Sequence, residues 1–265
     1  MSEETYTHGH HESVLRSHTW RTAANSAPNL LPLLRPGQSV LDVGCGPGTI
    51  TTDLAGLVAP GRVVGIDRSP AVIRLARAEA GGLDGLSFRV GDVYRLDFDA
   101  DTFDVVHAHQ TLQHLADPVR ALSEMRRVCR PDGVVAVRDG DYASFAWAPL
   151  DPRLDRWLGL YRALARHNGG EPDAGRFLLG WMRDAGFSEV RAGASIWCFS
   201  TPQDRAWWGG MWADRMRESA VAIQLVELGW STVDELADIG TAFRAWADHP
   251  AGWFAVPHGE AFGTP

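Results

Sequence analysis

The sequence predicts an α/β fold in which a mostly parallel sheet is flanked by helices. Two observations support this prediction. Short apolar runs rich in β-branched residues recur between residues 39 and 138, as in strands that are buried on both faces of a parallel sheet. Helix-start and helix-stop signals fill the intervals between these runs, so strand and helix alternate as they do in repeated β-α-β units.

The individual elements of this alternation follow from local signals. Five strands are predicted, at residues 39–43, 62–67, 86–90, 103–109 and 134–138. Ser69-Pro70 and Asp117-Pro118 each place an N-cap residue before a proline at the first helical position, so each predicts the start of a helix. Pro131-Asp132-Gly133 predicts a turn into the fifth strand.

The chain departs from this alternation at both ends. Residues 1–36 are predicted to form a lid made of a polar tail and a helix over 13–34, which ends before Pro36. After residue 141 we expect helices at 145–170, 177–185, 203–229 and 231–246, a sixth strand at 190–199 and a last strand at 252–262. The helices at about 145–170 and 203–249 are interpreted as insertions in one domain that spans 37–265.

Composition limits the kinds of molecule that this protein is expected to bind. The formal charge is −8, the pI is about 5.6 and no stretch is densely basic, which argues against nucleic acid and against anionic membranes as partners. The chain contains no Lys, which excludes mechanisms that need a Lys Schiff base or a P-loop Lys. The three cysteines are far apart, and the acidic start of the chain does not resemble a signal peptide, so we expect a cytoplasmic protein.

The strongest local signal is the stretch VLDVGCGPG at residues 40–48, where a buried strand leads through a glycine-rich turn into a helix. Glycines in such a turn let a ligand lie directly on the backbone. Thr49 stands where a dinucleotide dehydrogenase places its third glycine, which argues against that class, although a Rossmann-like fold for another nucleotide stays an alternative. Asp42, just before the turn, suits a ligand with a cationic ammonium end.

Two more acidic residues follow the ends of predicted strands. Asp67 ends the second strand, where a carboxylate accepts hydrogen bonds from ribose hydroxyls. Asp92 follows the third strand, where its side chain suits an adenine amino group and the backbone N–H of Val93 suits a ring nitrogen. Together these positions predict a site for an adenosine-containing ligand.

These motifs, at residues 41–48, 67, 91–92 and 103–106, resemble the class I S-adenosylmethionine (SAM)-dependent methyltransferases. The resemblance is greatest to the ubiquinone and menaquinone methyltransferases and the small-molecule methyltransferases of secondary metabolism; it covers residues 37–141 and then fades. It implies a Rossmann-like, seven-stranded sheet in the order 3-2-1-4-5-7-6, with the last strand antiparallel. It also implies that SAM and its product S-adenosylhomocysteine (SAH) are held by Asp42, Gly44, Cys45, Gly46, Gly48, Asp67, Arg68, Asp92 and Val93.

The reaction implied is an in-line displacement, for which a protein mainly aligns the reactants and excludes water. A general base is needed only if the acceptor arrives protonated, and the candidates are His109, His114 and Asp139 or Asp141. For His109, at the end of the fourth strand, we favour the alternative that it positions SAM. Arg21 is expected either to clamp the SAM carboxylate or to form a surface salt bridge.

The acceptor pocket is predicted in the tryptophan-rich part of the chain. Ten of the eleven Trp residues lie between residues 147 and 253, where they form either an apolar lid or ordinary helix packing. Tyr142 and Trp147 are the residues that we place in this pocket, because the loop after the fifth strand leaves from the ligand-binding edge of the sheet.

The sequence therefore predicts an O-, N- or C-methyltransferase acting on a small, partly aromatic or apolar metabolite, as a monomer or homodimer. The alternatives are a SAM-binding protein without catalysis and a methyltransferase acting on protein or nucleic acid. No metal is expected, because the N-terminal histidines His8, His10 and His11 match no common metal-site spacing and this displacement chemistry needs none.

Overall fold

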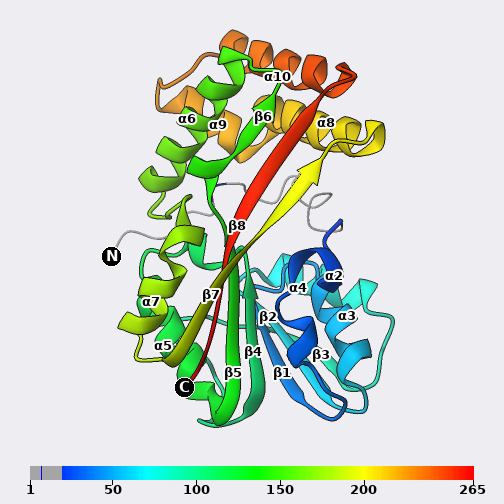
Figure 1. The fold of residues 1–265 in the computed structure, drawn as a ribbon, viewed down its shortest axis with the longest axis vertical. Helices are drawn as coiled ribbons and strands as arrows, with labels where there is room; N and C mark the ends of the chain where they lie inside the picture. The colour runs from blue at the N-terminus through cyan, green and yellow to red at the C-terminus, as the bar shows by residue number, and fades with distance from the viewer. Residues whose placement is uncertain (1–6, 8–19) are drawn as a thin grey trace.

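The computed structural model describes Thr7 and residues 20–265, and its centre is a mixed eight-stranded sheet (Figure 1). The five strands of the parallel part are β1 (Ser39–Val43), β2 (Arg62–Asp67), β3 (Leu86–Val90), β4 (Phe103–His109) and β5 (Cys129–Gly140). The three later strands are β6 (Ala146–Ala148), β7 (Ser188–Phe199) and β8 (Trp253–Thr264). Half of the N-terminal lid predicted for residues 1–36 lies outside the described residues, as do the three N-terminal histidines.

The strand order is β3-β2-β1-β4-β5-β8-β6, with β7 paired to β8. Strands β1 to β5 are parallel to one another, whereas β8 is antiparallel to β5, β6 and β7. The predicted α/β fold with a mostly parallel sheet is therefore confirmed, but the strand count and order differ slightly from the prediction, because β6 is an additional short strand in a segment predicted to be helical. Strand β6 pairs with the start of β8, beyond the stretch that pairs with β5.

Helices cover both faces of the parallel strands. They are α2 (Ala23–Ser26), α3 (Thr49–Val58), α4 (Pro70–Glu79), α5 (Pro118–Val128) and α7 (Leu178–Asp184). The alternation of side chains along each strand divides the core: Val40 faces α3, whereas its neighbour Leu41 faces α5 and α7. Ser69 and Asp117 cap α4 and α5 as the sequence predicts, each accepting a hydrogen bond from a backbone N–H three residues on.

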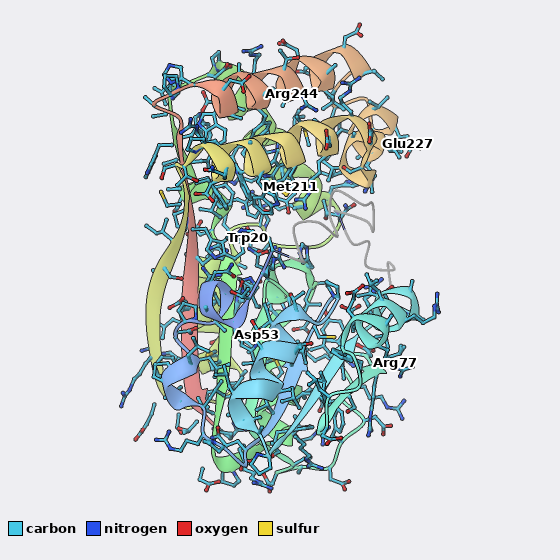
Figure 2. All side chains as sticks on the ribbon, turned by 90° about the vertical axis from the view of Figure 1, so that its right-hand side faces the viewer. Trp20, Asp53, Arg77, Met211, Glu227 and Arg244 are labelled. Atoms are coloured by element: carbon cyan, nitrogen blue, oxygen red, sulfur yellow. The ribbon has the colours of Figure 1, made fainter. Side chains whose placement is uncertain are left out.

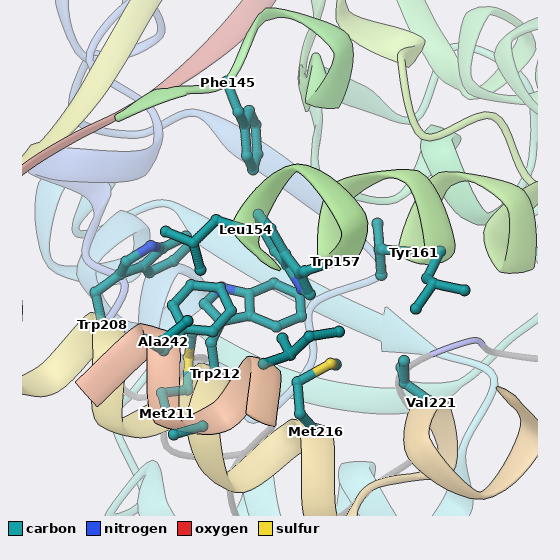
Figure 3. Packing of buried hydrophobic residues seen from close by; sticks show 14 of the residues in the cluster. Phe145, Leu154, Trp157, Tyr161, Trp208, Met211, Trp212, Met216, Val221 and Ala242 are labelled. Carbon is teal, nitrogen blue, oxygen red and sulfur yellow. The ribbon is translucent and has the colours of Figure 1, made fainter. Parts of the chain in front are cut away.

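A helical layer stands beyond the carboxyl ends of the parallel strands, carried there by the long strands β7 and β8 (Figure 1). Its helices are α6 (Pro152–His167), α8 (Pro202–Glu218), α9 (Ala220–Glu227) and α10 (Val233–Asp248). Their shared core includes Trp157, Trp212 and Phe243, all fully buried (Figure 3).

Several predicted boundaries differ from the structure. The predicted helix over 13–34 is reduced, within the described residues, to α2 and a 3-10 turn at Leu31–Leu33, because Pro28 and Pro32 lack the N–H that a continuous helix needs. The turn predicted at residues 131–133 is an irregular stretch inside β5, where the register against β4 shifts.

The late helices also differ in detail. The predicted helix over 203–229 is interrupted at Ser219, whose backbone is extended and whose hydroxyl donates to the Arg215 carbonyl at 2.7 Å. The helix predicted over 231–246 begins at Val233 with Thr232 as its N-cap, and the Ser231 hydroxyl donates to the Glu235 carboxylate. No described helix is long and apolar enough to cross a bilayer.

Candidate active site

A cavity of about 250 Å³ lies between the carboxyl ends of the parallel strands and helix α8. One side is formed by the turn after β1, the end of β2 and the loop 91–94. The other side is formed by residues after β4, by Tyr142 and Phe145, and by one face of α8. In Figure 2 the labelled Met211 of α8 stands above this region and Trp20 lies between the two halves of the molecule. The cavity therefore joins the predicted cofactor residues to the tryptophan-rich layer.

The glycine-rich turn owes its shape to left-handed backbone at Gly44, Gly46 and Gly48. A Cβ atom on Gly44 would lie 2.3 Å from Oγ1 of Thr111, and one on Gly48 would lie 2.6 Å from the ring of Phe88. Gly44 and Gly46 line the cavity, whereas Gly48 is the N-cap residue of α3. The glycines are thus required for the packing of the turn itself, a reason that the sequence analysis did not give.

Asp42 is buried at the floor of the cavity. Its Oδ2 atom accepts a hydrogen bond from the Thr51 hydroxyl at 2.6 Å, and its Oδ1 atom lies 2.9 Å from Nδ1 of His107. These contacts tie the end of β1 to α3 and β4. Its predicted contact with a ligand ammonium group stays a prediction.

The remaining acidic residues stand along the same wall. Asp67 accepts hydrogen bonds from the backbone N–H groups of Gly46 at 3.2 Å and Ser69 at 2.9 Å, and Asp92 accepts from the N–H of Tyr94 at 2.9 Å. Arg68, Val93 and Cys45 also line the cavity. Burial, with the nearby carboxylates of Asp42 and Asp67, raises the pKa of the Cys45 thiol well above its ordinary value, so this sulfur is a thiol at neutral pH.

His109, the last residue of β4, is buried on the cavity wall. Its Nδ1 atom lies 3.4 Å from a guanidinium nitrogen of Arg138. Arg138 itself donates to Ser195 at 3.0 Å and to Glu260 at 3.2 Å. Burial and then the charge of Arg138 lower the pKa of His109 well below its ordinary value, so the ring is neutral.

A second buried histidine, His258, stands beside His109. Its Nε2 atom lies 2.8 Å from the Gln110 amide nitrogen, and its Nδ1 atom lies 2.9 Å from the Val256 carbonyl oxygen. Gln110, whose backbone is left-handed with φ of 49°, accepts a hydrogen bond from Arg21. Arg21 also lines the cavity, and its contact with the SAM carboxylate stays a prediction.

The sequence analysis missed Arg138 and His258. Neither belongs to a recognisable motif, since they come from β5 and β8 and reach His109 only through sheet pairing.

Two of the other candidate bases, His114 and Asp139, differ in position. His114 lines the cavity, and the Gln113 amide nitrogen lies 3.1 Å from its Nε2 atom. Burial lowers the pKa of His114 to about 3. Asp139 is fully buried away from the wall, where its carboxylate accepts the backbone N–H of Gln113 at 3.1 Å, and burial raises its pKa to about 7. The structure therefore assigns Asp139 a role in shaping the segment after β4 and gives no support to its role as a base.

One face of α8 forms the roof of the cavity. Trp208, Met211, Trp212 and Arg215 all line it, and their spacing of i, i+3, i+4 and i+7 places them on a single helical face. The guanidinium group of Arg215 lies 5.0 Å from the Trp212 ring centroid. The sequence analysis placed this segment over the site but missed Arg215; an arginine within an otherwise apolar helical stripe is the signal that identifies it.

Of the two residues predicted for the acceptor pocket, only one lines the cavity. Tyr142 lines the cavity, and its ring stacks against Phe145 at 4.4 Å and Tyr161 at 4.3 Å. Trp147 does not line it: its ring packs on Phe254 at 5.4 Å, within the core of the helical layer. Its position on β6, paired with β8, places it behind the cavity wall.

Comparisons with known proteins agree with this geometry. A family model described as "Methyltransferase domain" matches residues 34–178. An uncharacterized methyltransferase of Schizosaccharomyces pombe is 31% identical, over 96% of this chain and 94% of the relative. The nocamycin O-methyltransferase of Saccharothrix syringae is 33% identical, over 76% of this chain and 81% of the relative.

A similar fold is found in a solved structure of Haemonchus contortus phosphoethanolamine N-methyltransferase 2 in complex with phosphomonomethylethanolamine and SAH. It matches with a TM-score of 0.55 at 16% identity, over 88% of this chain and 50% of that one. Fold, motif order and family model agree, and the chain belongs to the class I SAM-dependent methyltransferases.

Proposed function

We propose that this enzyme transfers a methyl group from SAM to a small-molecule acceptor that occupies the same cavity. The observation that carries the proposal is the continuity of the cavity, which runs from Asp67 and Asp92 to the aromatic face of α8. An acidic end suits the hydroxyl and amino donors of the adenosine, and an enclosed aromatic end suits an organic acceptor.

The donor end has the features that SAM requires. The carboxylates of Asp67 and Asp92 are both on the cavity wall, and each retains acceptor capacity beyond its backbone partners. Asp67 would hold the ribose, Asp92 and Val93 the adenine, and Arg21 the carboxylate of the methionine part. When bound, SAM supplies an electrophilic methyl group on a sulfonium.

The protein's own contribution to the transfer is alignment and the exclusion of water. Trp208, Met211 and Tyr142 enclose the acceptor end, so an acceptor there meets apolar and aromatic surface on several sides. An enclosed site strengthens the few polar contacts that orient the acceptor and keeps water from competing with it. The name of the nocamycin O-methyltransferase, which refers to a small molecule, agrees with this size of acceptor.

The test is a transfer assay with SAM that carries an isotopic label in its methyl group. We expect label to enter compounds of a small-molecule extract, detected by mass spectrometry, and SAH to bind the protein in calorimetry. Label found only in protein or nucleic acid would favour the macromolecule alternative. Binding of SAH with no transfer to any fraction would favour a SAM-binding protein without catalysis.

A further inference from the structure

The histidines on and beside the cavity wall that follows β4 have their ring lone pairs in use. An arginine or an amide –NH2 only donates, so the nitrogen facing it must be the unprotonated one. In His109 this nitrogen is Nδ1, which faces Arg138; in His258 it is Nε2, which faces Gln110. The Nδ1 atom of His258 then carries the hydrogen and donates to the Val256 carbonyl, which agrees with the 2.9 Å contact. His114 receives the Gln113 amide in the same manner.

These rings are therefore poor bases. Burial lowers the pKa of His109, His114 and His258 below the ordinary histidine value, so protonating any of them is unfavourable at neutral pH. Burial also raises the pKa of the Tyr142 phenol, against the opposing effects of Tyr161, Arg215 and Arg21, and so disfavours a phenolate. Among the described residues on this side of the cavity, no side chain is suited to remove a proton from an acceptor.

The same wall instead offers hydrogen-bond donors. The Nε2 atom of His109, which carries the ring hydrogen in this tautomer, is buried with no partner among the described residues. The Nε1–H of Trp208, on α8, is likewise buried without a described partner. Arg215, a residue that is only 5% exposed, lies one helical turn beyond Met211 on the same face and adds a guanidinium group. A ligand that satisfies the N–H groups of His109 and Trp208 must offer hydrogen-bond acceptors.

We propose that the acceptor is an organic acid and that its carboxylate is the group that becomes methylated. This inference rests on the proposed function and names its substrate class. A carboxylate is an anion at neutral pH, since its pKa is near 4, and it accepts hydrogen bonds without donating any. It therefore needs no base, and its oxygens can accept hydrogen bonds from the buried N–H groups of His109 and Trp208, on the cavity wall that Arg215 also lines.

The transfer balances without a proton. A lone pair on the carboxylate oxygen forms the new O–C bond to the methyl carbon, while the electron pair of the S–C bond returns to sulfur. The negative acid and the positive sulfonium become a neutral ester and a neutral thioether. Phenols, alcohols and protonated amines all need a proton removed before they can attack the methyl group.

The test uses the lability of a methyl ester. Wild-type protein is incubated with methyl-labelled SAM and a panel of aliphatic and aromatic carboxylic acids, each paired with the alcohol and the amine of the same carbon skeleton. Mild alkali then releases labelled methanol from esters but not from ethers or methylamines. We expect the transferred label to be alkali-labile and to appear with acids only. Label in alkali-stable products of the alcohols or amines would overturn the proposal.

Two further readouts distinguish binding from chemistry. Because a carboxylate stays ionised, kcat/KM for the acid should be flat between about pH 6 and 8.5; a rise with pH in this window would indicate proton removal and contradict the proposal. Arg215→Met should lower kcat/KM for the acid by about 10- to 100-fold. Arg215→Lys should lower it by a smaller factor. Both variants should leave the SAH dissociation constant unchanged. Arg217→Met, on the exposed side of α8, is the matched control.

The two proposals fail in different ways. If SAH does not bind wild-type protein, the proposed function fails. If SAH binds and label is transferred only to alkali-stable products, the proposed function holds and the carboxylate acceptor is wrong. An Arg215→Met variant that keeps full kcat/KM for the acid, while Trp fluorescence and the unfolding transition confirm its fold, would also contradict the role of Arg215.

Discussion

The Oδ2 atom of Asp67 accepts a hydrogen bond from the backbone N–H of Gly46 at 3.2 Å. This bond joins the last residue of β2 to the glycine-rich turn after β1, and both residues line the cavity. The ribose-binding carboxylate that we propose is therefore fixed by the turn that borders it, and a change at either residue should reach the cofactor.

Asp67→Ala should weaken SAH binding by on the order of 1.5–3 kcal/mol, because hydrogen bonds to a charged group are lost. Isothermal titration calorimetry measures the change. Asp53→Ala removes a carboxylate that accepts the Ala23 N–H at 2.8 Å and does not line the cavity, so it serves as the control for loss of an acid. An unchanged dissociation constant for Asp67→Ala would remove Asp67 from the cofactor site.

Gly44→Ala should destabilise the fold by roughly 1–3 kcal/mol, since the backbone there is left-handed and the new Cβ would collide with Thr111. Gly56→Ala, in α3, meets no atom within 4 Å and should be neutral or stabilising by up to about 1 kcal/mol. Urea unfolding of both variants checks the pair. Equal stability of the two would show that the turn tolerates a side chain.

The buried ion pair of Arg138 and Glu260 should behave as a unit. Glu260→Gln leaves the fully buried guanidinium without its charge partner and should cost about 3–5 kcal/mol, whereas Arg138→Met combined with Glu260→Gln should cost less than the two single changes added together. A double-mutant cycle in chemical denaturation measures this coupling. Additive effects would mean that the two charges do not stabilise each other.

The raised pKa of Asp139 predicts how the free energy of unfolding changes with pH. Its pKa is raised from 3.8 to about 7 by burial, so the folded protein binds its proton more tightly than the unfolded chain does. Wild-type stability should therefore fall, relative to Asp139→Asn, as pH rises from about 4 to 7, and the difference should then level off. Linkage gives a change on the order of 2–4 kcal/mol. A pH-independent difference would show that Asp139 is ionised in the fold.

Tyr142→Phe should change the kinetics of the acceptor more than the binding of SAH. The variant keeps the rings stacked on Phe145 and Tyr161 and loses only the hydroxyl, so the fold should be retained. We expect kcat/KM for the acceptor to fall several-fold, on the order of one lost hydrogen bond, with the SAH dissociation constant unchanged. A loss confined to SAH affinity would place Tyr142 at the cofactor end instead.

The cofactor end of the site was predictable because its signals are local. A strand end, a glycine turn and a capped helix are encoded within a few residues, and the carboxyl ends of parallel strands meet at one edge, which brings Asp42, Asp67 and Asp92 together. The predicted C-terminal end of the helix at 13–34 was wrong, because Pro28 and Pro32 interrupt a continuous helix. The cytoplasmic location and the monomer or homodimer state stay predictions.

The acceptor end was less predictable because it depends on pairing between distant segments. Arg138 and His258 reach His109 only because β8 inserts antiparallel beside β5, and no local pattern contains that register. Trp147 and Trp208 both lie in the tryptophan-rich part of the chain, so composition does not distinguish them. Trp147, on β6, packs behind the cavity wall, whereas Trp208, on α8, lines the cavity. Only the helical spacing of 208, 211, 212 and 215 carried that information in the sequence.

The most direct test is the position of SAH in a crystal structure of the complex. We predict electron density for SAH in the cavity, with its ribose hydroxyls on Asp67, its adenine beside Asp92 and Val93, and its sulfur directed toward the end that Tyr142 and α8 enclose. Density for SAH elsewhere on the molecule, or with its sulfur directed away from α8, would contradict the account.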